Sequence, residues 1–183
     1  MTMTKTLAGL AMTVALLSVA GCMREADAPA ASPVPAASPS VALEPMQTAL
    51  DGIPEGGNCS LDTINQQPVA VVTLRAGAPA TFVGWVGDTQ GEVPSDVRLV
   101  LAGAGGTYSA PVQTGLDRPD VAAALGQPGL ATSGLIASTV LDIAPGSYRV
   151  SVVSGTPAAL HCQFDVELEL GEAESQSGMA GSR

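Results

Sequence analysis

The chain has 183 residues, 46% of them hydrophobic, and a formal net charge of −10 at pH 7. A chain with this much negative charge is a poor partner for nucleic acid, because contacts to phosphate backbones rely on lysine and arginine. The chain contains one histidine and none of the common nucleophile, metal-protease or phosphate-loop motifs, so we expect neither an enzyme nor a cofactor.

The first feature along the chain is a short apolar segment that ends at a cysteine. Residues 7–20 follow a polar start containing Lys5, and they are too few to span a bilayer, which needs about 20 residues. This length and the small residues before Cys22 are typical of a secretory signal. An ordinary signal peptide with a chance cysteine at its cleavage site is the alternative interpretation.

The stretch Val19-Ala20-Gly21-Cys22 resembles the lipobox of bacterial lipoproteins. The resemblance implies that residues 1–21 are removed and that acylated Cys22 attaches the chain to a lipid bilayer. In diderm members of this family, an aspartate directly after the cysteine favours the inner membrane. Met23 stands there in this chain, so the resemblance implies a lipid anchor at the outer membrane.

Composition then divides the rest of the chain into three parts. Residues 22–57 are dense in proline, alanine and serine, which predicts a disordered tether with extended, polyproline-like segments. Residues 171–183 are small and polar and predict a disordered tail. The segment 58–170 between them has the length of one domain.

Within this domain, runs rich in valine and leucine alternate with turn residues, which predicts β-strands. Alternation in the last run places Cys162 toward the core and His161 toward solvent. Pro119, Asp120 and Gly126 are typical of the start, first turn and end of a short helix near 119–125. The expected strands are 59–64, 69–75, 81–87, 97–102, 107–113, 135–141, 148–153 and 160–170.

The stretch at residues 144–148 (APGSY) resembles the proline-glycine turn and following tyrosine of fibronectin-type and other immunoglobulin-like sandwiches. The resemblance implies that Tyr148 hydrogen-bonds back to the backbone at a corner. With the number of expected strands, it leads us to expect an all-β fold. The finer expectation is an immunoglobulin-like antiparallel β-sandwich of about 7–8 strands with one short inserted helix.

Two cysteines, Cys59 and Cys162, remain once Cys22 is assigned to the anchor. An even number of cysteines in an exported chain indicates a disulfide, here between the first and last strands of the domain. A zinc site would need about four ligands, and His161 with the two cysteines supplies at most three. We therefore expect a structural disulfide and no metal.

Two further motifs have no assigned role: residues 84–88 (GWVGD) and 118–121 (RPDV). With residues 133–135 (SGL), they resemble a pattern in extracytoplasmic β-sandwich domains of proteobacterial proteins. One interpretation is packing, with Trp85 in the core and Arg118 paired with Asp117 or Asp120. The other is a surface that binds a ligand or partner through Trp85, Arg118 and Asp120.

We therefore expect a membrane-anchored lipoprotein of the bacterial cell envelope that acts as a non-catalytic interaction or structural module for an envelope protein. A small-ligand or glycan-binding lipoprotein is the alternative, and a carboxylate-dependent hydrolase is a third interpretation. The chain has five aromatic residues, one Trp, two Tyr and two Phe, which gives few rings to stack on sugars.

Overall fold

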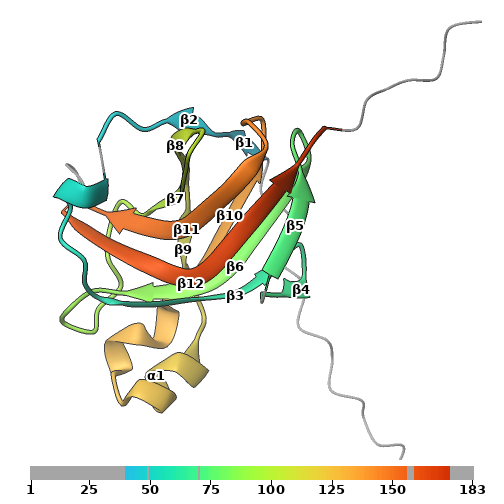
Figure 1. Ribbon diagram of the computed structural model, residues 1–183. Coiled ribbons are helices and arrows are strands. Elements are labelled where there is room, and N and C mark those ends of the chain that lie inside the picture. Colours follow the sequence, from blue (N-terminus) through green and yellow to red (C-terminus); the bar gives the residue numbers. More distant parts are fainter. Residues whose placement is uncertain (1–39, 49, 70, 156–158, 174–183) are drawn as a thin grey trace, which may run out of the picture. The chain divides into compact units, whose positions relative to one another are not determined.

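The structure is a computed structural model that describes residues 40–48, 50–69, 71–155 and 159–173 (Figure 1). Within these residues, twelve strands form two six-stranded sheets, with one α-helix and two 3₁₀-helices. The all-β fold expected from the sequence is confirmed. Cys22, the expected signal peptide and the first part of the expected tether lie outside the described residues.

The first sheet, called sheet A, has the order β1-β10-β6-β3-β4, and β9 also pairs with β10. Sheet B has the order β2-β8-β7-β11-β12-β5. The strands of sheet A are β1 (Val41–Ala42), β3 (Asn58–Ile64), β4 (Gln67–Pro68), β6 (Pro79–Gly87), β9 (Gln113–Leu116) and β10 (Gly134–Val140). Those of sheet B are β2 (Glu44–Pro45), β5 (Val71–Arg75), β7 (Arg98–Gly103), β8 (Gly106–Pro111), β11 (Gly146–Ser154) and β12 (Leu160–Gly171).

Both sheets are mixed, which corrects the expectation of purely antiparallel sheets. β1 runs parallel to β10, and β5 runs parallel to β12. The remaining strand pairs are antiparallel, including the β7–β8 hairpin that closes at Gly103 and Gly106. The burial pattern of a strand fixes which face is buried but not the direction of its neighbour, so the parallel pairs left no signal in the sequence.

A common core lies between the two sheets. Phe82 and Leu135 from sheet A and Leu99, Val150 and Phe164 from sheet B are each at most 1% exposed. Side chains on β12 alternate between the core and solvent, as predicted from its sequence. The alternation of apolar and polar residues in β12 therefore identified correctly which of its side chains face the core.

The inserted helix α1 spans Pro119–Leu125, as predicted, and lies below the sheets in Figure 1. Gly126 ends it in the left-handed conformation, with φ of 66°, which a residue without Cβ adopts at least cost. A 3₁₀-helix, η2 (Pro128–Thr132), follows and leads directly into β10.

The described domain begins earlier in the chain than expected, because part of the expected tether (22–57) packs onto the sheets. β1 and β2 pair with β10 and β8, and the 3₁₀-helix η1 (Leu50–Gly52) follows. Ile53 is buried against Val100 and Val153 on the outer face of sheet B. Widely spaced apolar side chains thus anchor a segment whose average composition resembles a linker.

Candidate functional site

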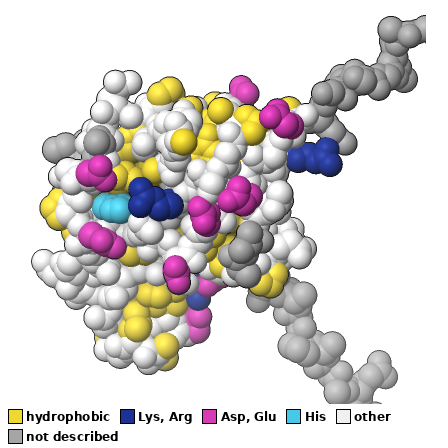
Figure 2. Space-filling view, viewed as in Figure 1, with side chains coloured by type: hydrophobic (Ala, Val, Ile, Leu, Met, Phe, Trp, Pro, Cys, Tyr) yellow, Lys and Arg dark blue, Asp and Glu magenta, His cyan; other side chains and the backbone are white. Residues whose placement is uncertain are grey.

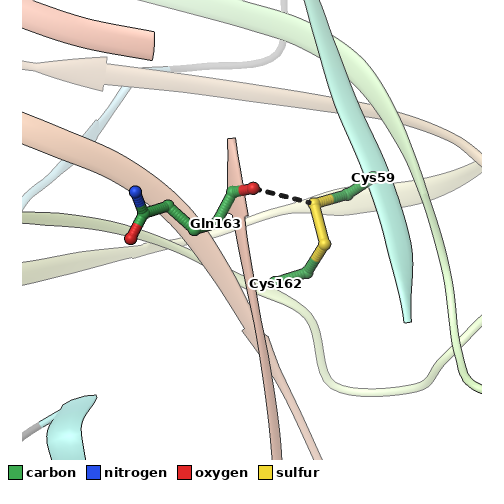
Figure 3. The surroundings of a disulfide bond; sticks show 3 residues. All are labelled: Cys59, Cys162 and Gln163. Atoms are coloured by element: carbon green, nitrogen blue, oxygen red, sulfur yellow. Dashed lines mark hydrogen bonds between the residues drawn. A yellow bond between two sulfur atoms is a disulfide. The ribbon is translucent and has the colours of Figure 1, made fainter. Parts of the chain in front are cut away.

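The Cys59–Cys162 disulfide expected from the sequence is present and joins β3 of sheet A to β12 of sheet B (Figure 3). The Cys59 Sγ lies 3.7 Å from the backbone oxygen of Gln163, the contact drawn as a dashed line. A disulfide sulfur has no hydrogen to donate, so this contact is polar but is not a conventional hydrogen bond. Both thiols are used in the bond, so neither is available as a metal ligand.

Arg118, directly before α1, is the centre of a charged cluster on sheet A. Its Nη1 donates to Asp62 on β3 at 2.7 Å, and its Nη2 donates to Asp120 at 2.8 Å. Its Nε donates to the other Asp120 oxygen at 3.0 Å, which makes the Asp120 contact bidentate. The expected pairing with Asp120 is present, whereas Asp62, 56 residues away along the chain, was not anticipated.

In this cluster, Arg118 and Asp120 stabilise each other's charged forms. The hydrogen bonds from the Arg118 guanidinium lower the pKa of Asp120 from its ordinary 3.8 to about 2. The Asp120 carboxylate in turn raises the pKa of Arg118, although partial burial opposes that shift. A carboxylate with so low a pKa is a poor proton acceptor at neutral pH, so the arrangement favours holding and recognition over proton transfer.

Trp85 does not lie in the core, which corrects the packing interpretation of this residue. Its neighbours Gly84 and Val86 on β6 are buried, while Trp85 is half-buried on the opposite, outer face of sheet A. There it lies opposite Ser60 on one side and Gly134 on the other. Two residues identified from the sequence, Trp85 and Arg118, are therefore on the same face.

Glycines on this outer face make room for the inserted segment. A Cβ on Gly134 would lie 3.0 Å from Cγ of Arg118 and 2.8 Å from Cβ of Leu116. A Cβ on Gly87 would lie 2.5 Å from a methyl group of Leu130, a residue of η2 that is completely buried. The outer face thus carries no side chain at these two positions, where the segment that contains Arg118 and Leu130 packs closely on the sheet.

A second site, which the sequence did not suggest, lies on the outer face of sheet B. Figure 2 views this face and shows the histidine beside a basic side chain, with acidic side chains around them. Two adjacent hollows, of about 470 and 350 Å³, share Leu50, Asp51 and Arg149 in their walls. His161 lines the smaller one, on the outer face where the alternation of β12 predicted it.

Of the four buried side-chain polar atoms without a partner in the described part of the chain, two belong to residues that line these hollows. Arg149 forms no ion pair or side-chain hydrogen bond with any residue that the structure describes. The Ser151 side chain is buried, with the residue 1% exposed, and its Oγ has no hydrogen-bond partner among the described residues. The buried Nε2 of His161, a partly buried residue, likewise has no partner among them. Within the described ranges, no three potential ligands are arranged to hold a metal ion.

No protein-family model matches the chain, and neither the curated proteins nor the solved structures compared with it contain a match. In the part of the chain that the structure describes, no helix has the length and apolar character needed to cross a bilayer.

Proposed function

We propose that the chain is a lipid-anchored protein of the bacterial cell envelope that acts as a non-catalytic interaction module for another envelope protein. The observation that carries the proposal is the Cys59–Cys162 disulfide. Disulfides persist in oxidising compartments outside the cytoplasm, so this bond supports export. The lipobox-like sequence ending at Cys22 supplies the anchor, and Met23 after it favours the outer membrane.

An immunoglobulin-like sandwich is the finer fold that we propose for the domain. The Tyr148 hydroxyl donates to the Ala144 backbone oxygen at 2.7 Å, across the turn that precedes β11. Immunoglobulin-like domains use a tyrosine in this manner to tie a corner to the strand that follows. Two sheets around one core and a buried tyrosine at a corner support this assignment, while the parallel pairs distinguish the domain from its simplest form.

The partner surface that we propose is the outer face of sheet A around Trp85, Arg118 and Asp120. Tryptophan and arginine are enriched among residues that contribute most to binding energy at protein interfaces. Trp85 offers a large, partly exposed ring, and the ion pairs to Asp62 and Asp120 hold the guanidinium in one orientation. A fixed arginine loses less conformational entropy when a partner docks.

Two measurements test this proposal. Intact mass spectrometry of the membrane-purified protein should show loss of residues 1–21 and added acyl mass on Cys22, and an unmodified Cys22 would refute the anchor. Cross-linking in intact cells should capture a defined envelope protein with the wild type and lose it with Cys22→Ala and with Trp85→Ala. Val41→Ala, which shortens another exposed apolar side chain on sheet A, is the matched control and should retain capture.

The second candidate function is binding of a small ligand, with a glycan as one form of it. The hollows on sheet B, with unpaired Arg149 and the unpartnered Ser151 hydroxyl, favour this candidate. Their walls contain no Trp, Tyr or Phe ring, so they lack the stacking surface typical of sugar sites. A charged ligand fits these walls better than a neutral sugar.

A further inference from the structure

We propose that the outer face of sheet B holds a binding site for a diamino acid, a small ligand with one carboxylate and two ammonium groups. The carboxylate binds Arg149, and the ammonium groups bind the acidic side chains around it. This inference specifies the ligand class of the second candidate function. It uses a different face from the proposed partner surface and does not depend on the lipid anchor.

The site is built by two neighbouring strands and a crossing segment. Arg149 and Ser151 stand on the outer face of β11, and Gln163, on β12, is the register partner of Ser151. The N-terminal segment closes the side: the His161 backbone N–H donates to the Pro54 oxygen, and the Gly56 N–H donates to the His161 oxygen, both at 2.9 Å. The hollow is thus formed by backbone pairing, which holds its walls in place.

The size of the site suits a small molecule. The two hollows, of about 470 and 350 Å³, meet at Asp51 and Arg149. Small-molecule sites typically measure about 300–1,000 Å³, so either hollow has room for one amino acid. The larger hollow also presents Thr107, Ser147 and Glu167, and the smaller one presents Glu55, Ser151, His161 and Gln163.

The unpartnered atoms are the independent sign of a ligand. Buried polar side chains are nearly always hydrogen-bonded, because removing a hydroxyl from water without giving it a new partner is unfavourable. Ser151 Oγ and His161 Nε2 both lack a partner within the described ranges, and both belong to residues lining the smaller hollow. The smaller hollow therefore lies beside two polar side chains whose hydrogen-bonding capacity the described residues do not use.

The charges of the walls select the ligand class. Arg149 is the one arginine among the lining residues, and its free guanidinium matches a carboxylate through two parallel hydrogen bonds. Three carboxylates, Asp51, Glu55 and Glu167, line the same hollows. The excess of negative charge in the walls repels a dicarboxylic acid, whereas a diamino acid complements both the arginine and the carboxylates.

The experiment compares two probes that differ only in the carboxylate: L-lysine and L-lysinamide. Their binding to the purified full chain is measured by isothermal titration calorimetry at low salt. We expect lysine to bind about tenfold or more tightly than lysinamide, because hydrogen bonds between charged groups are among the strongest. Arg149→Met, which keeps the apolar stem of the side chain, should weaken lysine binding and remove this preference, and it should not weaken lysinamide, whose positive charges the arginine repels.

The acidic walls are tested by Asp51→Asn and Glu55→Gln, each of which should weaken both probes severalfold. Asp142→Asn is the matched control, because it removes the same charge from an exposed position outside the hollows and should change nothing. Near-ultraviolet circular dichroism verifies that each variant is folded. The proposal is overturned if lysine gives no binding heat at millimolar concentration, if lysine and lysinamide bind equally, or if the control weakens binding as much as Asp51→Asn.

Discussion

Removing the disulfide should cost this domain much of its stability, because the bond closes a very long loop. Cys59 and Cys162 are 103 residues apart. For a loop of about 100 residues, the chain-entropy model gives about 4.7 kcal/mol of stabilisation, through the restriction of the unfolded chain. The total stability of a domain is about 5–15 kcal/mol, so the double variant Cys59→Ala/Cys162→Ala should be only marginally folded.

The expected effect on the melting temperature follows from the size of the domain. Unfolding entropy is about 2.1 cal/mol/K per residue, so for about 130 residues a loss of about 4.7 kcal/mol lowers Tm by about 17 °C. Differential scanning calorimetry of the double variant measures this shift, and the wild type in excess reductant should melt at the same temperature. Cys22→Ser is the control, since that cysteine closes no loop, and its Tm should not change. A shift below about 5 °C in the double variant would refute the loop-closure argument.

Three further predictions concern single side chains. Tyr148→Phe removes the hydroxyl that donates to the Ala144 oxygen and should lower the free energy of unfolding by about 1 kcal/mol, measured by urea denaturation; an unchanged midpoint would contradict a role for this bond. The folded-state pKa of Asp120 is about 2, below its ordinary 3.8, so its stabilising effect is complete above about pH 4 and is lost as the pH falls toward 2. Asp120→Asn should lack that part of the acid dependence, and NMR titration of the Asp120 carboxyl carbon checks the pKa directly. Ser151→Ala removes a buried hydroxyl without a protein partner and should leave the urea midpoint unchanged or raise it; a clear loss of stability would show that the hydroxyl has a partner in the unliganded protein.

Much of the fold could be predicted because local chemistry and global structure agree in this chain. The alternation in β12 identified its buried face, and Pro119 and Gly126 marked the ends of α1. The two cysteines left after Cys22 could pair only with each other within the chain, so the disulfide followed from counting. Each of these features is encoded in a few neighbouring residues or in a simple parity, which is why sequence reasoning found them.

The features that were missed depend on contacts between distant residues. Asp62 contacts Arg118 across 56 positions, and nothing near Asp62 in the sequence marks it as a partner. The packing interpretation placed Trp85 in the core, but strand parity assigns the core side to Phe82 and Val86 on the same strand. Parity in β6 was the available signal for choosing between the two interpretations of Trp85.

The segment 40–57 shows why composition misjudged the domain boundary. Proline and alanine dominate its surroundings, yet Leu43, Met46, Leu50 and Ile53 each pack on the domain. These contacts bring Asp51 and Glu55 to the outer face of sheet B, where they line the same hollow as Arg149. The segment predicted to be only a tether therefore supplies one wall of the proposed ligand site.

On each outer face a segment of the chain packs against the sheet, but the two faces differ in whether the arginine there is paired. On sheet A, Gly87 and Gly134 let the inserted segment pack directly on the strands, and the charges of Arg118 are satisfied within the protein. On sheet B, the covering segment touches the sheet through Ile53 and leaves Arg149 without a partner. A charge that the fold leaves unpaired beside a formed hollow is the stronger indication of a ligand. Sheet B is therefore the better candidate for small-molecule recognition, while sheet A, with its charges already paired and Trp85 partly exposed, better suits a protein partner.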